Sequence, residues 1–147
     1  MANLPKRGLA ARKALFALVL AVIVLAIVSV VLQNRPWTVP EEAKQRQNPL
    51  QPSAAALQSA RSVYSEKCAS CHGDTGKGDG PDASSHNPAP SDFTDRQRLR
   101  TESDGELFYK ITEGRKPMPS FKKRLTEEQR WRLVLLIRSF SSPNAHP

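Results

Sequence analysis

A run of 19 residues without a charge, at positions 14–32, most constrains how this chain can fold. The run reads ALFALVLAVIVLAIVSVVL, and Ser29 is its single polar side chain. As a helix it would be about 28 Å long, which is enough to cross the hydrocarbon core of a bilayer. The sequence therefore predicts a transmembrane anchor at 14–32, and much of the chain's 39% apolar content lies outside any soluble core.

Flanking charges predict the orientation of this anchor. Residues 1–13 contain no acidic residue and carry four basic ones, Lys6, Arg7, Arg12 and Lys13. The positive-inside rule then predicts a cytoplasmic N-terminus, and a single-pass protein of the cell inner membrane whose remainder is periplasmic. Arg35 and Trp37 would mark the far interface. A cleaved signal peptide is the alternative, but the run exceeds the usual ~7–15 apolar residues and no small-residue cleavage site follows it.

The segments on either side of the remaining domain are polar. Residues 33–52 alternate prolines with charged and amide side chains and show no apolar periodicity. Because prolines favour extended backbone, we predict a solvated, Pro-rich linker that holds the domain off the membrane. Residues 142–147 have nothing to bury and are predicted to be a flexible tail.

Three helices are predicted within residues 53–141. The first begins at Ser53 as N-cap and places one residue in every three or four on a single face, namely Leu57, Ala60, Tyr64, Cys68 and Cys71. The second, SDGELFYKITEG, opens with a Ser103–Glu106 capping box and ends at Gly114. The third, TEEQRWRLVLLIRSF, opens with a Thr126–Gln129 capping box. No segment shows the alternation of a strand, so we predict an all-α domain with long loops.

The sequence CASCH contains the only two cysteines, Cys68 and Cys71, followed directly by His72. C-x-x-C-H is typical of haem c attachment, in which two thiols on one helix face form thioethers with the porphyrin vinyl groups. His72 can then reach the iron. A domain with so small an apolar core also commonly needs a cofactor or metal to stabilise it. The motif therefore predicts one covalently attached haem c.

Other interpretations of the motif fit less well. A structural zinc site needs four ligands, and only His86 and His146 follow the motif. A thioredoxin-like pair would follow a strand, and a disulfide across three residues would close a very small loop. The glycines of GDTGKGDGP follow a helix rather than a strand, which argues against a phosphate-binding loop, and Gly73 is placed to end the helix after His72.

Four segments together resemble a class I cytochrome c domain, LQSARSVYSEKCASCHGDTGKGDGP, NPAPSDFTD, SDGELFYKITEGRKPMPSF and LTEEQRWRLVLLIRSF. The resemblance covers nearly all of residues 53–141. Domains of this sort are found in bacterial membrane-anchored monohaem cytochromes and in cytochrome subunits of respiratory complexes. It implies three main helices around one haem, with the iron ligated by His72 and Met118. Two residues depart from the family pattern, Ala60 where relatives often have glycine and Leu136 where many have tyrosine.

The resemblance also implies that His72 donates its second ring proton to a carbonyl of the proline loop. We predict Pro90 as this acceptor, with Pro88 left open. The predicted haem pocket, whose members could equally be ordinary core, comprises Phe93, Leu99, Phe108, Ile111, Phe121 and Leu135.

The residues around Met118 also favour it as a ligand of the haem iron. Pro117 and Pro119 enclose it and would stiffen the loop that holds a soft thioether on iron. Met118 as a core filler, or His86 or His146 as the ligand in its place, are the alternatives.

These ligands predict an electron carrier rather than an enzyme, because His72 and Met118 together leave the iron no vacant position. The net charge of +8 falls to +3 for residues 53–147, which does not indicate nucleic acid. Basic residues of the Met118 loop could steer acidic redox partners, namely Lys116, Lys122, Lys123 and Arg124. A cytochrome subunit fixed within an oxidase or dehydrogenase, and a haem enzyme acting on peroxide, are the alternatives. The sequence does not identify the electron donor or acceptor.

Overall fold

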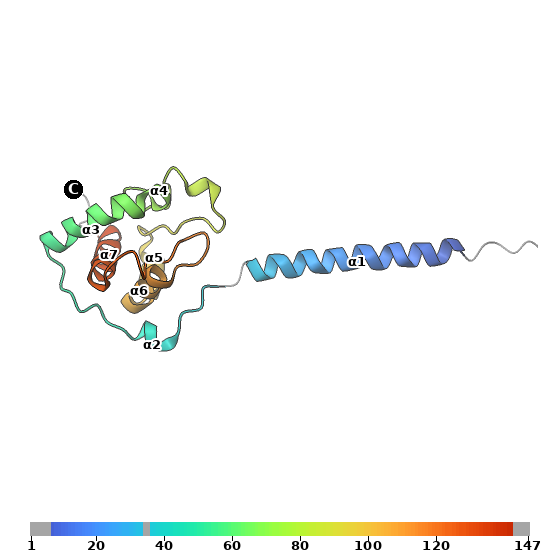
Figure 1. The fold of residues 1–147 in the computed structure, drawn as a ribbon, viewed down its shortest axis with the longest axis horizontal. Coiled ribbons are helices and arrows are strands. Elements are labelled where there is room, and N and C mark those ends of the chain that lie inside the picture. Colours follow the sequence, from blue (N-terminus) through green and yellow to red (C-terminus); the bar gives the residue numbers. More distant parts are fainter. Residues whose placement is uncertain (1–6, 34–35, 143–147) are drawn as a thin grey trace, which may run out of the picture. The chain divides into compact units, whose positions relative to one another are not determined.

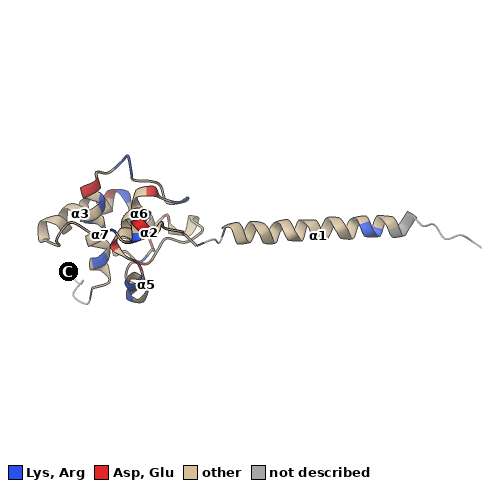
Figure 2. Cartoon of the chain, turned by 90° about the horizontal axis from the view of Figure 1, so that it is seen from below, with Lys and Arg blue, Asp and Glu red and all other residues tan. Residues whose placement is uncertain are grey.

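The computed structural model describes residues 7–33 and 36–142 and divides the chain into two compact units, 1–37 and 38–147. The described part of the first unit is dominated by the helix α1 (Arg7–Gln33). Its segment Ala10–Leu32 has a mean hydropathy of 3.4, buries none of its surface, and is long and apolar enough to cross a membrane. Figure 2 shows that the basic residues of α1 lie near its N-terminal end. The helix is compatible with the predicted single-pass anchor.

The regular elements of the second unit are helices among its described residues, joined by long loops (Figure 1). Its elements are α2 (Glu41–Lys44), α3 (Ala54–Lys67), α4 (Ala69–His72), the 3₁₀ turn η1 (Ala83–Ser85), α5 (Arg96–Thr101), α6 (Asp104–Glu113) and α7 (Glu127–Phe140). An isolated bridge between Arg115 and Met118 is the one β-type pairing between described residues. The prediction of an all-α domain is confirmed. Residues 1–6 and the tail residues 143–147 lie outside the described part.

Local side-chain hydrogen bonds define where the three predicted helices begin. Ser53 accepts a hydrogen bond from the backbone N–H of Ala56, and Ser103 caps α6 in the same way. Thr126 and Gln129 form both hydrogen bonds of a capping box at the start of α7. Each cap satisfies a backbone N–H that has no partner within the helix. The three predicted N-caps are therefore confirmed, whereas both hydrogen bonds of a predicted capping box are seen at α7 and only the Ser103 half at α6.

The core lies where α3 packs along α7 and α7 packs against α6 (Figure 1). Ala60 of α3 is 1% exposed and Leu136 of α7 is fully buried, so both departures from the family pattern fit within the packed core. The sequence analysis missed the short helix α5. Its C-terminal end is held by Arg138 of α7, whose guanidinium donates to the carbonyl oxygens of Leu99 and Glu102.

The segment before α3 differs from its predicted role as a solvated linker. Val39 is only 4% exposed, Ala43 is buried, and α2 packs against α6. Asn48 donates a hydrogen bond to the Trp131 carbonyl of α7 at 3.0 Å. Residues 39–50 therefore belong to the folded domain. The sequence did not indicate this, because single side chains rather than a periodic apolar face attach the segment to the domain.

Candidate functional site

The C-x-x-C-H motif occupies a separate turn of helix. We expected one helix to run through His72, but α3 ends at Lys67, and Cys68 has φ −126° and ψ −34°. One further turn, α4, follows, in which the His72 N–H donates to the Cys68 carbonyl at 2.9 Å. Gly73, with φ +75°, then ends the turn as predicted. The hydrogen bond from His72 to Cys68 closes one turn that contains both cysteines and the histidine.

Cys68 and Cys71 are both free thiols and both half-buried. Burial, reinforced by the neighbouring Cys71, raises the pKa of Cys68 to about 12. The thiol is therefore protonated at neutral pH, unlike the low-pKa thiolates of redox-active cysteine pairs. No group of three or more His, Cys, Asp or Glu residues able to hold a metal occurs among the described residues. The raised pKa of Cys68 argues against the redox-pair interpretation.

His72 is fixed by contacts on two sides. Its Nδ1 lies 3.2 Å from the carbonyl oxygen of Ser91, and its ring stacks on Phe93 at 4.6 Å between centroids. Burial lowers the pKa of His72, which favours the neutral imidazole. When Nδ1–H donates to Ser91, Nε2 is the nitrogen left to bind a metal ion.

The acceptor for His72 is therefore Ser91, and the prediction of Pro90 or Pro88 in this role is wrong. The path of two facing loops explains the difference. Gly78 has φ +74°, and a Cβ on it would lie 2.5 Å from the Pro90 carbonyl oxygen. The Pro90 carbonyl thus faces Gly78, and the next carbonyl along the chain is directed at the imidazole. No local sequence signal distinguishes these adjacent carbonyls.

A second contact supports the same turn from the α3 side. The buried hydroxyl of Tyr64 donates to the Gly73 carbonyl at 2.8 Å. Sequence analysis placed Tyr64 on the apolar face of its helix but missed this hydrogen bond. It ties α3 to the residue directly after His72.

Met118 lies in the loop between α6 and α7, half-buried and packed against the core. The loop is folded back on α6, because Ser120 donates to the Thr112 carbonyl at 2.7 Å and the Phe121 N–H donates to Ile111 at 3.2 Å. Gly114, with φ +64°, permits the reversal, since a Cβ there would lie 2.4 Å from the Pro119 backbone. His86 is also half-buried, directly after η1, and His146 lies outside the described residues.

The predicted pocket residues fall into two groups. Leu135 is half-buried, and the other five are buried, namely Phe93, Leu99, Phe108, Ile111 and Phe121. Phe93 stacks on the imidazole of His72, whereas Phe108 stacks on Trp131 at 3.9 Å between centroids. Phe93 is thus the one whose ring contact directly involves a predicted ligand.

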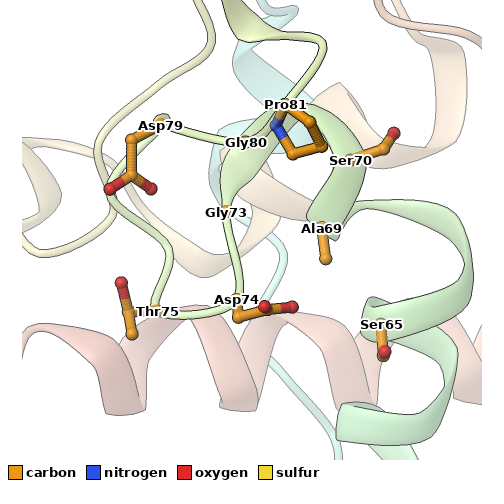
Figure 3. Close-up of a pocket in the computed structure, with 9 residues that line it drawn as sticks. All are labelled: Ser65, Ala69, Ser70, Gly73, Asp74, Thr75, Asp79, Gly80 and Pro81. Carbon is orange, nitrogen blue, oxygen red and sulfur yellow. The ribbon is translucent and has the colours of Figure 1, made fainter.

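A separate surface hollow lies beside α4, and Figure 3 shows its polar lining. Its residues come from the end of α3, from α4 and from the glycine loop, namely Ser65, Ala69, Ser70, Gly73, Asp74, Thr75, Asp79, Gly80 and Pro81. The lining includes none of the four predicted haem-binding side chains. It is therefore distinct from the candidate haem site.

The residues present fit a haem c. Two thiols lie within one turn, an imidazole is anchored through Nδ1 so that Nε2 remains, and a thioether lies in a loop packed on the same core. This set matches the thioether attachment and the His and Met ligands of c-type haem. Fold and donor set together define a class I c-type cytochrome domain.

Residues 55–137 match the family described as "Cytochrome C oxidase, cbb3-type, subunit III", and the chain belongs to this family. A solved structure, the Kuenenia stuttgartiensis reducing HAO-like protein complex Kustc0457/Kustc0458, contains a similar chain. The two are 28% identical with a TM-score of 0.55, and the match covers 76% of this chain and 54% of that one. This chain thus matches about half the length of its structural relative. No curated protein sequence matches it significantly.

Proposed function

We propose that this protein is a membrane-tethered monohaem c-type cytochrome that carries single electrons between respiratory partners outside the cytoplasm. The observation that carries the proposal is the C-x-x-C-H turn with His72 anchored on Ser91, in a chain of a cytochrome family. The apolar helix α1 supports the membrane anchor. The basic residues at its N-terminal end support a cytoplasmic N-terminus and a periplasmic haem domain.

In this proposal Cys68 and Cys71 would hold the haem covalently through their sulfur atoms, as thioethers. Bound haem c supplies a one-electron Fe(III)/Fe(II) couple. His72 is held in one orientation by its contacts with Ser91 and Phe93, so Nε2 stays directed at a fixed position. Met118 would supply the other protein ligand to the iron, a soft thioether that would favour ferrous iron and raise the potential.

Carrier function follows from the two axial ligands. When His72 and Met118 both bind the iron, no position is open to oxygen or peroxide. The chain then needs only to accept and release an electron, without moving a proton at a catalytic group. Support for this comes from the contacts that fold the Met118 loop back on α6, since they restrict the departure of the thioether.

Partners with acidic docking surfaces suit the Met118 loop. Its exposed basic residues are Lys116, Lys122, Lys123 and Arg124. Lys122 pairs with Glu113 at 3.0 Å, but its own side chain is 61% accessible, and the other three basic residues lie outside this pair. Clustered charge of this kind raises association rates with partners of opposite charge.

A second candidate is a cytochrome subunit fixed within a larger oxidase or dehydrogenase. The family description names an oxidase subunit, and the similar solved chain belongs to a protein complex, which favours this candidate. The apolar segment of α1 has few polar side chains that could form hydrogen bonds with partner helices in the membrane, which favours a tethered carrier.

Two measurements test the proposal. The oxidised holoprotein should show the absorption band for methionine-to-iron charge transfer, and its absence would favour the peroxide enzyme or a histidine ligand. Purification in mild detergent should then yield the cytochrome alone. Stoichiometric co-migrating subunits would replace the free carrier with the fixed subunit.

A further inference from the structure

Residues 39–50, which we call the strap, are attached to the outside of α6 and α7. Its first contact is through glycine. Gly105 lies inside α6, and a Cβ on it would be 2.0 Å from the Ala43 carbonyl oxygen and 2.7 Å from that of Arg46. Glycine is unfavourable within a helix, so the close approach of the strap gives a reason for its presence there. Ser103 adds a hydrogen bond of 2.6 Å to the Lys44 carbonyl.

Arg46 makes the second contact. Its guanidinium lies 4.7 Å from the ring centroid of Phe108 and 5.3 Å from that of Trp131. The same group pairs with Glu127 of α7 at 2.7 Å. Arginine above stacked aromatic rings gains a cation–π interaction in addition to the ion pair.

Asn48 and Leu50 complete the strap. The Asn48 amide donates to the Trp131 carbonyl at 3.0 Å and its oxygen accepts from the Leu50 N–H at 3.0 Å. Leu50 packs against the core. The strap is therefore held at several separate points, in spite of its polar composition.

The strap shortens the chain that is free between anchor and domain. Only residues 34–38 lie between the end of α1 at Gln33 and buried Val39. In any conformation, the six Cα–Cα steps from 33 to 39 span at most about 22 Å. If the strap were released, the 20 steps from 33 to 53 would span at most about 70 Å.

We propose that the strap limits the reach of the haem domain, so that it exchanges electrons with a redox partner whose docking site lies close to the same membrane surface. This inference rests on the proposed membrane anchor. It assigns residues 39–50 a function that a solvated spacer would not have, because a spacer of the same length would leave about three times as long a free chain between the anchor and the domain.

The first experiment measures whether the strap is docked. Hydrogen exchange of the backbone amides of residues 41–50 is followed by mass spectrometry in the full-length holoprotein in lipid nanodiscs. Gly105→Ala introduces a methyl group where the strap must lie, while alanine favours the helix α6. We expect exchange in residues 41–50 to accelerate at least about tenfold in Gly105→Ala, because exchange tracks local opening.

Arg46→Ala is the second variant, and it removes the cation–π and ion-pair contacts. Its control is Arg61→Ala, which removes the same charge from an exposed position on α3. We expect faster exchange in Arg46→Ala and wild-type exchange in Arg61→Ala. Equal exchange in wild type, Gly105→Ala and Arg46→Ala would overturn the docked strap.

The second experiment measures reach. The holoprotein is reconstituted into phosphatidylcholine vesicles that carry a fluorescent headgroup label, and the haem serves as the energy acceptor. Because release lengthens the free chain about threefold, we expect at least about a twofold loss of quenching in Gly105→Ala/Arg46→Ala. Unchanged quenching in this variant, with faster exchange, would overturn the limit on reach.

These outcomes are separate from a failure of the proposed function. Failure of the wild-type protein to float with vesicles would contradict the membrane anchor itself. A missing haem absorption spectrum would contradict the cytochrome assignment. A variant that keeps the wild-type haem spectrum and changes only exchange and quenching supports the strap specifically.

Discussion

Replacement of Gly78 by alanine tests how the tertiary structure tunes His72. The added Cβ would lie 2.5 Å from the Pro90 carbonyl oxygen, well inside contact distance, and the obstructing atom is backbone. The loop that carries Ser91 must therefore move away from the glycine loop. We expect this movement to lengthen or break the hydrogen bond from His72 Nδ1 to the Ser91 carbonyl, now 3.2 Å long.

Two contributions set the expected loss of stability in Gly78→Ala. The positive φ of +74° costs a non-glycine residue about 1–2 kcal/mol. Loss of the hydrogen bond adds about 0.5–1.5 kcal/mol. Without its acceptor the imidazole is a weaker donor to ferric iron, so the midpoint potential should rise. If the full energy of the lost hydrogen bond destabilises the ferric state, the midpoint potential rises by about 20–60 mV. For a one-electron couple, about 59 mV corresponds to a tenfold change in the equilibrium constant.

The assay combines denaturant unfolding of the holoprotein with redox titration. Gly76→Ala is the matched control, because Gly76 also has a positive φ, +79°, but its Cβ would meet the Phe140 side chain, which can turn away. We expect both variants to lose stability and only Gly78→Ala to shift the potential upward. The same potential in Gly78→Ala and wild type, with stability reduced in both variants, would refute the role of Ser91.

Four further variants address haem attachment, iron ligation and the support of the motif turn. Cys68→Ser or Cys71→Ser should lose covalent haem and most of the fold, and a variant that stayed helical without haem by circular dichroism would contradict the cofactor assignment. Met118→Ala should keep the haem, lower the potential and bind carbon monoxide when reduced, whereas an unchanged potential and no carbon monoxide binding would indicate a histidine ligand. Tyr64→Phe leaves the Gly73 carbonyl without its 2.8 Å donor and should lower the free energy of unfolding by about 1–3 kcal/mol, while an unchanged denaturation midpoint would show that water replaces the hydroxyl.

The sequence by itself determined the features that depend on neighbouring residues. Ser53 and the Thr126–Gln129 pair cap their helices because a side chain three residues away from a free N–H can reach it whatever the rest of the chain does. Gly73 ends the turn after His72 for a similarly local reason. The long uncharged run likewise predicts an apolar helix without reference to any other segment.

Tertiary structure decided what depends on contacts between distant segments. Ser91, rather than Pro90, accepts from His72 across 19 positions because the Gly78 loop fixes which carbonyl points at the ring. Arg46 and Asn48 attach the strap to Glu127 and Trp131, more than 80 positions away along the chain. No apolar periodicity in the sequence predicts these contacts. Each of them depends on the paths of two loops or helices at once, and local propensity does not specify such paths.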